Sequence, residues 1–597
     1  MNKIFVKFLF SNKEITVPKG RKLSEICAEN GYAQDLVCGG NGKCGKCGVE
    51  IIVDGKESTV LSCHYEVQQD IEIKRISNLS SRKVNVLTSN SRLDCEFNPS
   101  LEFLNVHKDD IKADHCSNVQ QKVYDKYKLK FSLNSAIKLS DEYFKLKDDQ
   151  ELSFVIYKDE IIDVLVGNQE KNILGMAIDI GSTTCAAYIY DMKNFKMLGA
   201  VSSLNMQTEL GADVISRIGF CVGKSAEDGV EVLRKKVSDT INMLLNDAKA
   251  LGIDTESIYH LVLCGNSTMQ HLFLGIYPEA LGKGPFISMT HDFIECTQRD
   301  TLLNLNKNAR ITFLPLLGGF VGADTTAVLI STPDDNKPRL VIDLGTNGEI
   351  AMGSAGKYLI ASTACGPALE GAGLCYGMRA ADGAIEHFQI NEDNSIDIQV
   401  IGKCRAKGIC GSGIIDILAE LLRHNVINKR GKMYSRDEYE KKYGENALSA
   451  RLQKIDDKNA FIIEQEDESG GIVAFTQMDV REIQKAKAAI AAGCKILVRN
   501  YGIKESEVHE ICLAGAFGNY LDVEQAQYVG LFPKFEGVPV RSIGNGAGSG
   551  VQMYLLDKAS VELCQNIQKN VDHIELNFED GFMDLYMSEM EFVNAGK

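Results

Sequence analysis

Four cysteines near the amino terminus constrain the fold of this chain more than any other sequence feature. They are Cys38, Cys44, Cys47 and Cys63, with the spacing C-x5-C-x2-C-x15-C. The first three lie in one glycine-rich loop, which lets the backbone come close enough to a cluster to offer N–H groups to its sulfides. This combination of thiolate spacing and glycine content predicts an iron–sulfur cluster held by all four side chains.

Two other interpretations of these cysteines remain open. Structural zinc sites usually pair two close cysteine or histidine knuckles, and here only Cys44 and Cys47 form one. Unligated core thiols are the third interpretation. They fit poorly because five glycines flank the cysteines within a dozen residues, namely Gly39, Gly40, Gly42, Gly45 and Gly48. The cluster is therefore favoured, and zinc ranks second.

The residues around the cysteines predict a small sheet with one helix. Polarity alternates over Lys3–Phe10 and Glu14–Val17, a helix is expected over Lys22–Asn30, and further strands are expected over Val49–Val53 and Asp70–Ile73. This order is typical of a β-grasp arrangement. The segment resembles a plant-type or adrenodoxin-type two-iron ferredoxin, although its first cysteine gap is one residue longer. The resemblance implies a 2Fe-2S cluster.

Three further segments follow this domain, which we bound at residues 1–76. Residues 77–99 are polar and predict a linker that lets the cluster domain swing. Residues 100–172 predict a small middle domain of mixed strand and helix without an interpretable motif. Residues 173–597 carry the remaining motifs. Division into domains is expected, because single cores stop growing well below 597 residues.

Composition excludes some partners. The net charge of −16 argues against nucleic acid and against anionic membranes. No apolar run reaches the length of a membrane span, so no membrane partner is expected. Many of the 18 cysteines lie inside apolar strands and are typical of reduced core residues, which predicts a cytoplasmic location.

Two apolar strands end in similar turns of glycine and hydroxyl residues. The first turn contains Asp179, Gly181, Ser182, Thr183 and Thr184, and the second contains Asp343, Gly345, Thr346 and Asn347. Such turns present N–H and O–H donors to phosphate oxygens, and a strand-end aspartate can hold a hydrated Mg²⁺. One copy would be weak evidence, because a glycine turn between strands is often only a hairpin. Two copies predict a phosphate-binding fold built by duplication.

Each turn is followed later in the chain by an apolar strand that runs into a glycine loop. The first runs from His260 to Thr268, and the second from Glu510 to Asn519. Loops of this form commonly contact nucleotides. The nucleotide-contacting residues of the second loop are expected to be Gly515, Ala516, Phe517 and Gly518. A duplicated fold that closes on a nucleotide is therefore expected.

These motifs resemble the phosphate-1, phosphate-2 and adenosine motifs of the superfamily of acetate and sugar kinases, heat-shock chaperones and actin. Joined to a ferredoxin-like domain, they resemble the ATP-dependent reductive activators of corrinoid proteins, and the resemblance covers nearly the whole chain. It implies an α+β multidomain fold. The expected parts are an amino-terminal β-grasp ferredoxin domain, a small middle α/β domain and a large duplicated actin/sugar-kinase-like α/β domain.

The resemblance also implies a function. One electron passes from a 2Fe-2S cluster to Co(II) on a corrinoid protein of a methyltransferase system and gives Co(I), with ATP and Mg²⁺ driving the step. An external low-potential electron donor is implied as a second partner, and the resemblance allows a homodimer.

Catalytic candidates lie beside the second turn. Glu349 is favoured as the carboxylate that orients water, with Asp343 beside it, and Glu370 is the alternative. Asp213 and Arg217 are four residues apart in an expected helix, which favours a surface ion pair over a role in the nucleotide cleft. The histidines form no pattern typical of nucleophilic catalysis.

Three alternative functions remain at this stage. The chain could be a small-molecule kinase of the same superfamily with an accessory redox domain. It could instead be an ATP-binding redox sensor that regulates partner binding without hydrolysis. An activator of radical dehydratases shares the nucleotide fold, but those proteins bridge a four-iron cluster between subunits, so the four local cysteines count against it.

Overall fold

The computed structural model describes most of the chain in two compact units. The described residues are 3–11, 13–30, 32, 34, 47–76, 93–147, 150–166, 172–211, 213–223, 226–345, 347–371, 373–465, 471–515 and 521–594. One unit comprises Met1–Ser331 with Ala547–Cys564, and the other comprises Thr332–Gly546 with Gln565–Lys597. The predicted 173–597 segment is therefore shared between the two units.

The amino-terminal segment forms a mixed five-stranded sheet in the order β2-β1-β7-β4-β5. Its strands are β1 (Lys3–Phe8), β2 (Lys13–Pro18), β4 (Gly48–Val53), β5 (Lys56–Leu61) and β7 (Ile71–Ile76). Alternate residues of β1 are buried, namely Ile4, Val6 and Phe8, and they share a core with helix α1 (Leu23–Glu29). The hairpin, helix and return strands thus occur in the predicted order, with β1 parallel to β7.

The segment predicted as a middle domain contains a four-stranded sheet in the order β8-β10-β11-β9. Its elements are β8 (Leu101–His107), α2 (Val119–Tyr127), β9 (Lys130–Phe131), α3 (Leu133–Tyr143), β10 (Glu151–Tyr157) and β11 (Glu160–Val166). The two helices and the sheet bury one apolar cluster. Most of the predicted linker, residues 77–92, lies outside the described residues. At its end, the Asn98 N–H donates to the Leu556 carbonyl at 3.0 Å.

A six-stranded sheet in the first unit has the order β14-β13-β12-β15-β17-β16. Its strands are β12 (Leu174–Ile180), β13 (Thr184–Asp191), β14 (Lys196–Leu204), β15 (Ile258–Gly265), β16 (Ile294–Thr297) and β17 (Arg310–Phe313). The helices of this region are α4 (Val214–Val222), α5 (Ala226–Ala250), α6 (Ser267–Leu274), α7 (Ala323–Ile330) and α12 (Gly546–Leu556).

The second unit contains another six-stranded sheet, in the order β28-β27-β18-β19-β20-β29. Its strands are β18 (Arg339–Leu344), β19 (Gly348–Ser354), β20 (Lys357–Thr363), β27 (Glu510–Ala514), β28 (Val540–Gly544) and β29 (Val571–His573). Its helices are α8 (Gly411–Arg423), α9 (Arg436–Tyr443), α10 (Gln477–Tyr501), α11 (Val523–Val529) and α14 (Phe582–Glu589), and the unit boundary after Cys564 divides α13 (Lys558–Asn570). Two three-stranded sheets complete this unit, with strands β21 (Ala384–Ile390), β22 (Ile396–Val400), β23 (Gly408–Ile409), β24 (Leu452–Ile455), β25 (Lys458–Glu464) and β26 (Val473–Thr476).

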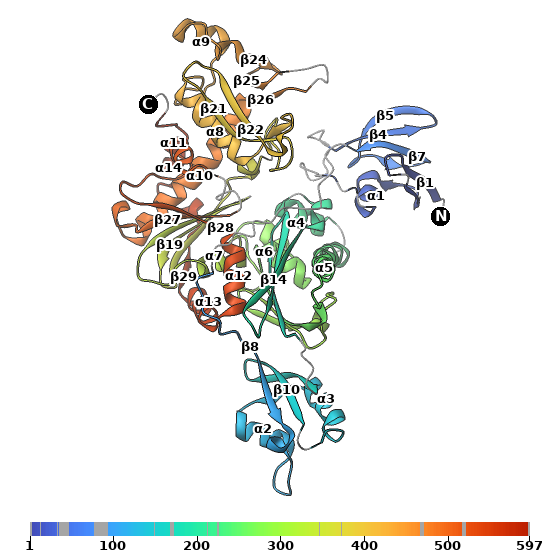
Figure 1. Ribbon diagram of the computed structural model, residues 1–597. Helices are drawn as coiled ribbons and strands as arrows, with labels where there is room; N and C mark the ends of the chain where they lie inside the picture. The colour runs from blue at the N-terminus through green and yellow to red at the C-terminus, as the bar shows by residue number, and fades with distance from the viewer. Residues whose placement is uncertain are drawn as a thin grey trace. The chain divides into compact units, whose positions relative to one another are not determined.

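The two six-stranded sheets repeat one local topology. Figure 1 labels β14 of the first sheet and β19, β27, β28 and β29 of the second. In the first, β12 pairs antiparallel with β13 and parallel with β15. In the second, β18 pairs antiparallel with β19 and parallel with β27. Each predicted phosphate turn therefore joins the first two strands of a meander, and each glycine loop follows the parallel neighbour. The duplication predicted from the two turns is confirmed.

No helix in the described part of the chain is long and apolar enough to cross a membrane.

Candidate functional site

The first predicted phosphate turn is a tight hairpin between β12 and β13. The Gly181 N–H donates to the Thr184 carbonyl at 3.0 Å, which closes the turn directly after Asp179 and Ile180. A β carbon added at Gly181 would lie 2.5 Å from the Thr184 carbonyl oxygen, so only glycine fits there. We call residues 181–184 the first tip.

The carbonyl groups of the first tip are held by one later segment of the chain. Asn205 donates through Nδ2 to the Gly181 carbonyl at 3.0 Å and through its backbone N–H to the Thr183 carbonyl at 2.8 Å. Arg217 Nη2 donates to the Ser182 carbonyl. Three successive carbonyl oxygens thus have donors from the segment that follows β14.

The structure corrects the predicted surface pair of Asp213 and Arg217. Arg217 is fully buried, with an exposed fraction of 0%. Asp213 is the N-cap of α4 and accepts from the Ser216 N–H at 2.8 Å in a capping box. The four-residue spacing predicts a surface ion pair, but the Arg217 side chain instead points into the interior and contacts the first tip.

The glycine loop after β15 meets the first tip. Asn266 caps α6 by accepting from the Met269 N–H at 3.0 Å, and its Nδ2 donates to Ser182 Oγ at 3.1 Å. Cys264 lies near the end of β15, with its Sγ 3.8 Å from Asp179 Oδ1. The predicted turn and the predicted loop of the first half therefore come together.

A carboxyl group that the sequence did not single out lies at the same place. Asp324 is in the first turn of α7. A β carbon added at Gly322 would lie 2.7 Å from Asp324 Oδ1 and 2.4 Å from the Asn266 Cα, which locates the carboxyl beside the glycine loop. Burial raises the pKa of Asp324 to about 6, although the Thr325 N–H donates to it at 2.8 Å. Its sequence signal is an aspartate at the start of an apolar helix after the run Gly318-Gly-Phe-Val-Gly322.

The second predicted turn has similar geometry. The Gly345 N–H donates to the Asn347 carbonyl at 3.0 Å between β18 and β19, and Thr346 lies outside the described residues. Gly515 follows β27 with φ of +94°, and a β carbon there would lie 2.8 Å from Asp343 Oδ1. The predicted residues Asp343 and Gly515 are thus brought together. The other predicted loop residues, Ala516, Phe517 and Gly518, lie outside the described residues.

Two carboxylates, both considered from the sequence, lie near this second turn. Glu349 pairs with Asp343 across the two strands and accepts from Ser362 Oγ at 3.5 Å, a long hydrogen bond. A β carbon added at Gly345 would lie 3.9 Å from Glu370 Oε1. Burial, followed by the charges of Glu349 and Glu370, raises the pKa of the Cys365 thiol. The geometry leaves both glutamates as candidates for orienting water.

Two of the four predicted cluster ligands are described, and they lie together. Cys47 Sγ and Cys63 Sγ are 3.2 Å apart, and the two residues are 1% and 2% exposed. Two thiolates at ~2.3 Å from one tetrahedral metal ion stand about 3.8 Å apart, so a small outward shift lets this pair ligate one ion. Cys38 and Cys44 lie outside the described residues.

A buried polar chain fixes the backbone next to this thiol pair. Ser62 Oγ donates to Gln34 Oε1 at 2.7 Å, and Gln34 Nε2 donates to the Gly48 carbonyl at 3.2 Å. Among the described residues no group of three or more histidine, cysteine, aspartate or glutamate side chains could hold a metal ion. Only two of the four predicted cysteine ligands, Cys47 and Cys63, are among these residues.

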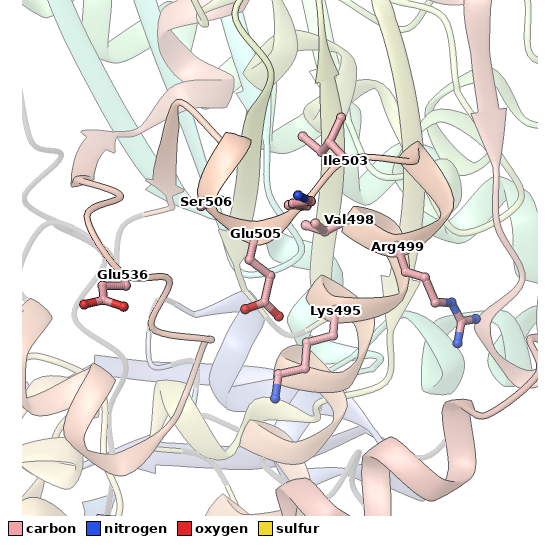
Figure 2. Close-up of a pocket in the computed structure, with 8 residues that line it drawn as sticks. Lys495, Val498, Arg499, Ile503, Glu505, Ser506 and Glu536 are labelled. Atoms are coloured by element: carbon pink, nitrogen blue, oxygen red, sulfur yellow. The ribbon is translucent and has the colours of Figure 1, made fainter.

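A surface pocket in the second unit lies at the carboxyl-terminal end of α10 (Figure 2). Two of its basic side chains have carboxylate partners, with Lys495 2.6 Å from Glu589 and Arg499 3.8 Å from Glu579. None of its lining residues belongs to a phosphate turn or a glycine loop. We assign it no part in the site.

Two family models match the chain from residue 174 onward. The model of the C-terminal domain of RACo, the ASKHA domain, matches residues 337–597, and the model of the RACo middle region matches residues 174–335. The boundary between these two matches lies close to the boundary between the two structural units, at Ser331 and Thr332.

Individual relatives extend the match to the amino terminus. The corrinoid activation enzyme RamQ of Eubacterium limosum is 42% identical over 600 residues, covering 98% of this chain and 99% of the relative. A Co(II) methylated amine-specific corrinoid protein reductase of Methanosarcina barkeri is 24% identical over 456 residues, covering 71% of this chain and 77% of the relative. A solved structure of a reductive activator for corrinoid, iron-sulfur protein superposes with a TM-score of 0.72 at 26% identity, covering 100% of this chain and 99% of that one.

Proposed function

Because this chain belongs to the RACo family of reductive activators of corrinoid proteins, we propose that it activates a corrinoid protein of a methyltransferase system by ATP-dependent reduction. In the proposed reaction Co(II) on the partner accepts one electron and becomes Co(I). The observation that carries the proposal is the presence, in one chain, of a buried thiol pair at Cys47 and Cys63 and of duplicated phosphate turns.

The residues proposed to hold a 2Fe-2S cluster are Cys38, Cys44, Cys47 and Cys63. When bound, such a cluster supplies a one-electron carrier of low potential. Burial of Cys47 and Cys63 keeps water from their sulfur atoms, and the chain of Ser62, Gln34 and Gly48 holds the adjacent backbone in place. Both features support a rigid, water-poor ligand environment.

The residues proposed to bind Mg-ATP belong to the two turns and to the second glycine loop. The phosphate contacts are assigned to Gly181, Ser182, Thr183, Thr184, Gly345, Thr346 and Asn347. Asp179 and Asp343, at the strand ends, are assigned to the hydrated Mg²⁺, since hard cations prefer carboxylate and water oxygens. Adenosine is assigned to Gly515, Ala516, Phe517 and Gly518, and Glu349 to the orientation of water.

A need for ATP follows from the potentials. Plant-type clusters lie near −400 mV. If the cobalt couple of the partner lies about 100 mV lower, transfer of one electron costs about 2.3 kcal/mol, since 59 mV corresponds to a factor of ten. Nucleotide binding offsets that cost only when the nucleotide binds more tightly to the conformation in which cobalt is reduced. An external low-potential donor must supply each electron.

The proposal is tested with a corrinoid protein in the Co(II) state, an excess of a low-potential donor, and two variants that separate its parts. Cys47→Ser is expected to alter the visible spectrum of the cluster and to abolish Co(II) reduction while Mg-ATP still binds. Asp179→Ala is expected to weaken Mg-ATP binding and to abolish Co(II) reduction while the cluster spectrum is unchanged. Full Co(II) reduction by either variant contradicts the proposal.

A small-molecule kinase is the alternative that the same preparation excludes or supports. A coupled kinase assay without reductant detects phosphoryl transfer to candidate acids and sugars. The proposed function predicts no such transfer, whereas turnover with a small substrate and no effect of a corrinoid protein would support the kinase.

A further inference from the structure

A fully buried arginine lies behind the first tip, and we propose that Arg217 is the positioning residue that sets this tip for the phosphates of ATP. The inference rests on the proposed function, because that proposal assigns phosphates to residues 181–184. Arg217 has an exposed fraction of 0% and does not face solvent, so its effect on a nucleotide is exerted through the backbone that it contacts.

The guanidinium of Arg217 connects the first tip with the segment that contains Gln207 and Gly211. Its Nε donates to the Gly211 carbonyl at 2.9 Å, its Nη1 donates to Gln207 Oε1 at 3.1 Å, and its Nη2 donates to the Ser182 carbonyl. Gln207 is itself fully buried and donates through Nε2 to the Leu233 carbonyl on α5 at 2.9 Å. The arginine therefore ties the first tip to α5 through a fixed, fully packed side chain.

The contact with Ser182 determines where the next N–H group points. In a planar trans peptide the C=O of one residue and the N–H of the following residue point in opposite directions. Because the Ser182 carbonyl points at Arg217, the Thr183 N–H points away from the interior. Asn205 acts in the same way on the Gly181 carbonyl, so the Ser182 N–H also points outward. Two consecutive N–H donors on one side of a turn form the kind of concavity that binds anions.

The chemistry of the side chain suits this task better than that of any other residue. Arginine stays charged at all relevant pH values and presents its donors in a rigid planar fork. A lysine ammonium is a single point of charge on a flexible stem and cannot reach the acceptors of Ser182, Gln207 and Gly211 with the same geometry. Arg217→Lys therefore keeps a positive charge and loses the fork.

Binding measurements on the complete, cluster-loaded chain test the inference. Mg-ATP, Mg-ADP and adenosine are titrated into the wild type and Arg217→Lys under anaerobic conditions, and the cluster spectrum and melting temperature confirm that the variant is folded. The expected result is about tenfold weaker binding of Mg-ATP and Mg-ADP with adenosine binding unchanged, since loss of a hydrogen bond from a charged donor is of this size. The KM of any ATP turnover is expected to rise more than kcat falls.

Two further variants keep the test decisive. Gln207→Leu leaves Arg217 in place, removes one of its acceptors and is expected to weaken Mg-ATP binding about threefold. His260→Asn is the matched control, because His260 is buried on β15 and contacts Thr312 at 3.2 Å without touching the tip. It is expected to lower the melting temperature and to leave Mg-ATP binding unchanged.

The outcomes separate this inference from the proposed function. If the wild type does not bind Mg-ATP, the proposed function fails. If the wild type binds Mg-ATP and folded Arg217→Lys binds it within twofold, the positioning role is overturned. Equal losses for Mg-ATP and adenosine also overturn it, because they indicate a general structural role. If Arg217→Lys does not fold, wild-type affinity in Gln207→Leu overturns it.

Discussion

Replacing Asp324 by asparagine should stabilise the protein at neutral pH. Burial raises the pKa of this carboxyl from 3.8 to about 6, so the folded state holds its proton to a higher pH than the unfolded state does. Between these two values the folded state binds more protons, and its stability therefore falls as pH rises. The neutral, nearly isosteric amide of Asp324→Asn removes this dependence.

The size of the expected stabilisation follows from the pKa shift of Asp324. A difference of about 2 pKa units at about 1.4 kcal/mol per unit amounts to about 3 kcal/mol at pH 7.5, where the effect is complete. At pH 5 the carboxyl is ionised in most unfolded molecules but protonated in most folded ones. The stabilisation expected from Asp324→Asn therefore falls to about half of its value at pH 7.5. A change of 3 kcal/mol corresponds to a rise in melting temperature of roughly 4 °C for a large domain.

Scanning calorimetry of wild type and Asp324→Asn at pH 7.5 and pH 5 measures both values. Asp335→Asn is the control of opposite sign, because the Arg339 guanidinium holds the pKa of Asp335 down to about 2 and its charge stabilises the fold above that pH. That variant is expected to melt at a lower temperature at both pH values. If Asp324→Asn also melts lower at pH 7.5, the carboxylate is charged and favourably bonded in the folded state, and the reasoning is refuted.

Three other perturbations test separate features. Gly515→Ala should weaken Mg-ATP binding and destabilise the second unit by about 1 to 3 kcal/mol, because φ of Gly515 is +94° and the new β carbon would meet Asp343. Unchanged affinity for Mg-ATP in a calorimetric titration would contradict this. Lys487→Met should abolish the rise in stability between pH 8 and pH 10, since burial lowers the pKa of this lysine to about 8 and the folded state binds fewer protons there than the unfolded state. If the free energy of unfolding of the variant, measured by denaturant titration, still rises over this pH range, the prediction is wrong. Cys47→Ser should change the number of iron atoms or the electron paramagnetic resonance spectrum of the reduced protein, and an unaltered spectrum would remove Cys47 from the ligand set.

The sequence was sufficient to predict the duplication and the two turns. Both follow from local patterns: an apolar strand, a glycine turn closed by its own backbone, and a second strand. Gly181 and Gly345 close their turns through hydrogen bonds within three residues, so the turns themselves are locally encoded, whereas the donors to the carbonyls of the first tip come from Asn205 and Arg217. The structure adds the strand order, in which β27 pairs with β18 and brings Asp343 next to Gly515, as β15 pairs with β12 beside Asp179.

The positions of Arg217 and Asp324 could not be predicted in the same way. Two opposite charges four residues apart in a helix usually face solvent, and that expectation gave the wrong place for Arg217. Its acceptors include groups of residues 182, 207 and 211 and the Met269 sulfur, so its burial is decided by tertiary packing. The pKa of Asp324 likewise depends on how closely Gly322 packs on Asn266, a contact between segments more than fifty residues apart.

The cluster ligands were predicted from cysteine spacing, and two of the four, Cys47 and Cys63, are among the described residues. Cys47 and Cys63 are sixteen residues apart in sequence and 3.2 Å apart at their sulfur atoms. Strand pairing of β4 with β5 brings them together, because Gly48 is opposite Leu61 in the register. The other two ligands stay predictions until spectroscopy of the cysteine variants tests them.

The central claim is that ATP makes electron transfer from this chain to a corrinoid possible, and one measurement tests it most directly. The protein is purified and reduced anaerobically, mixed with a Co(II) corrinoid protein and excess low-potential donor, and the Co(I) absorbance is followed with and without Mg-ATP. The Co(I) signal is expected to grow only when Mg-ATP is present. Absence of ATP-dependent Co(I) across several corrinoid proteins, from a preparation that carries its cluster and binds Mg-ATP, would contradict it.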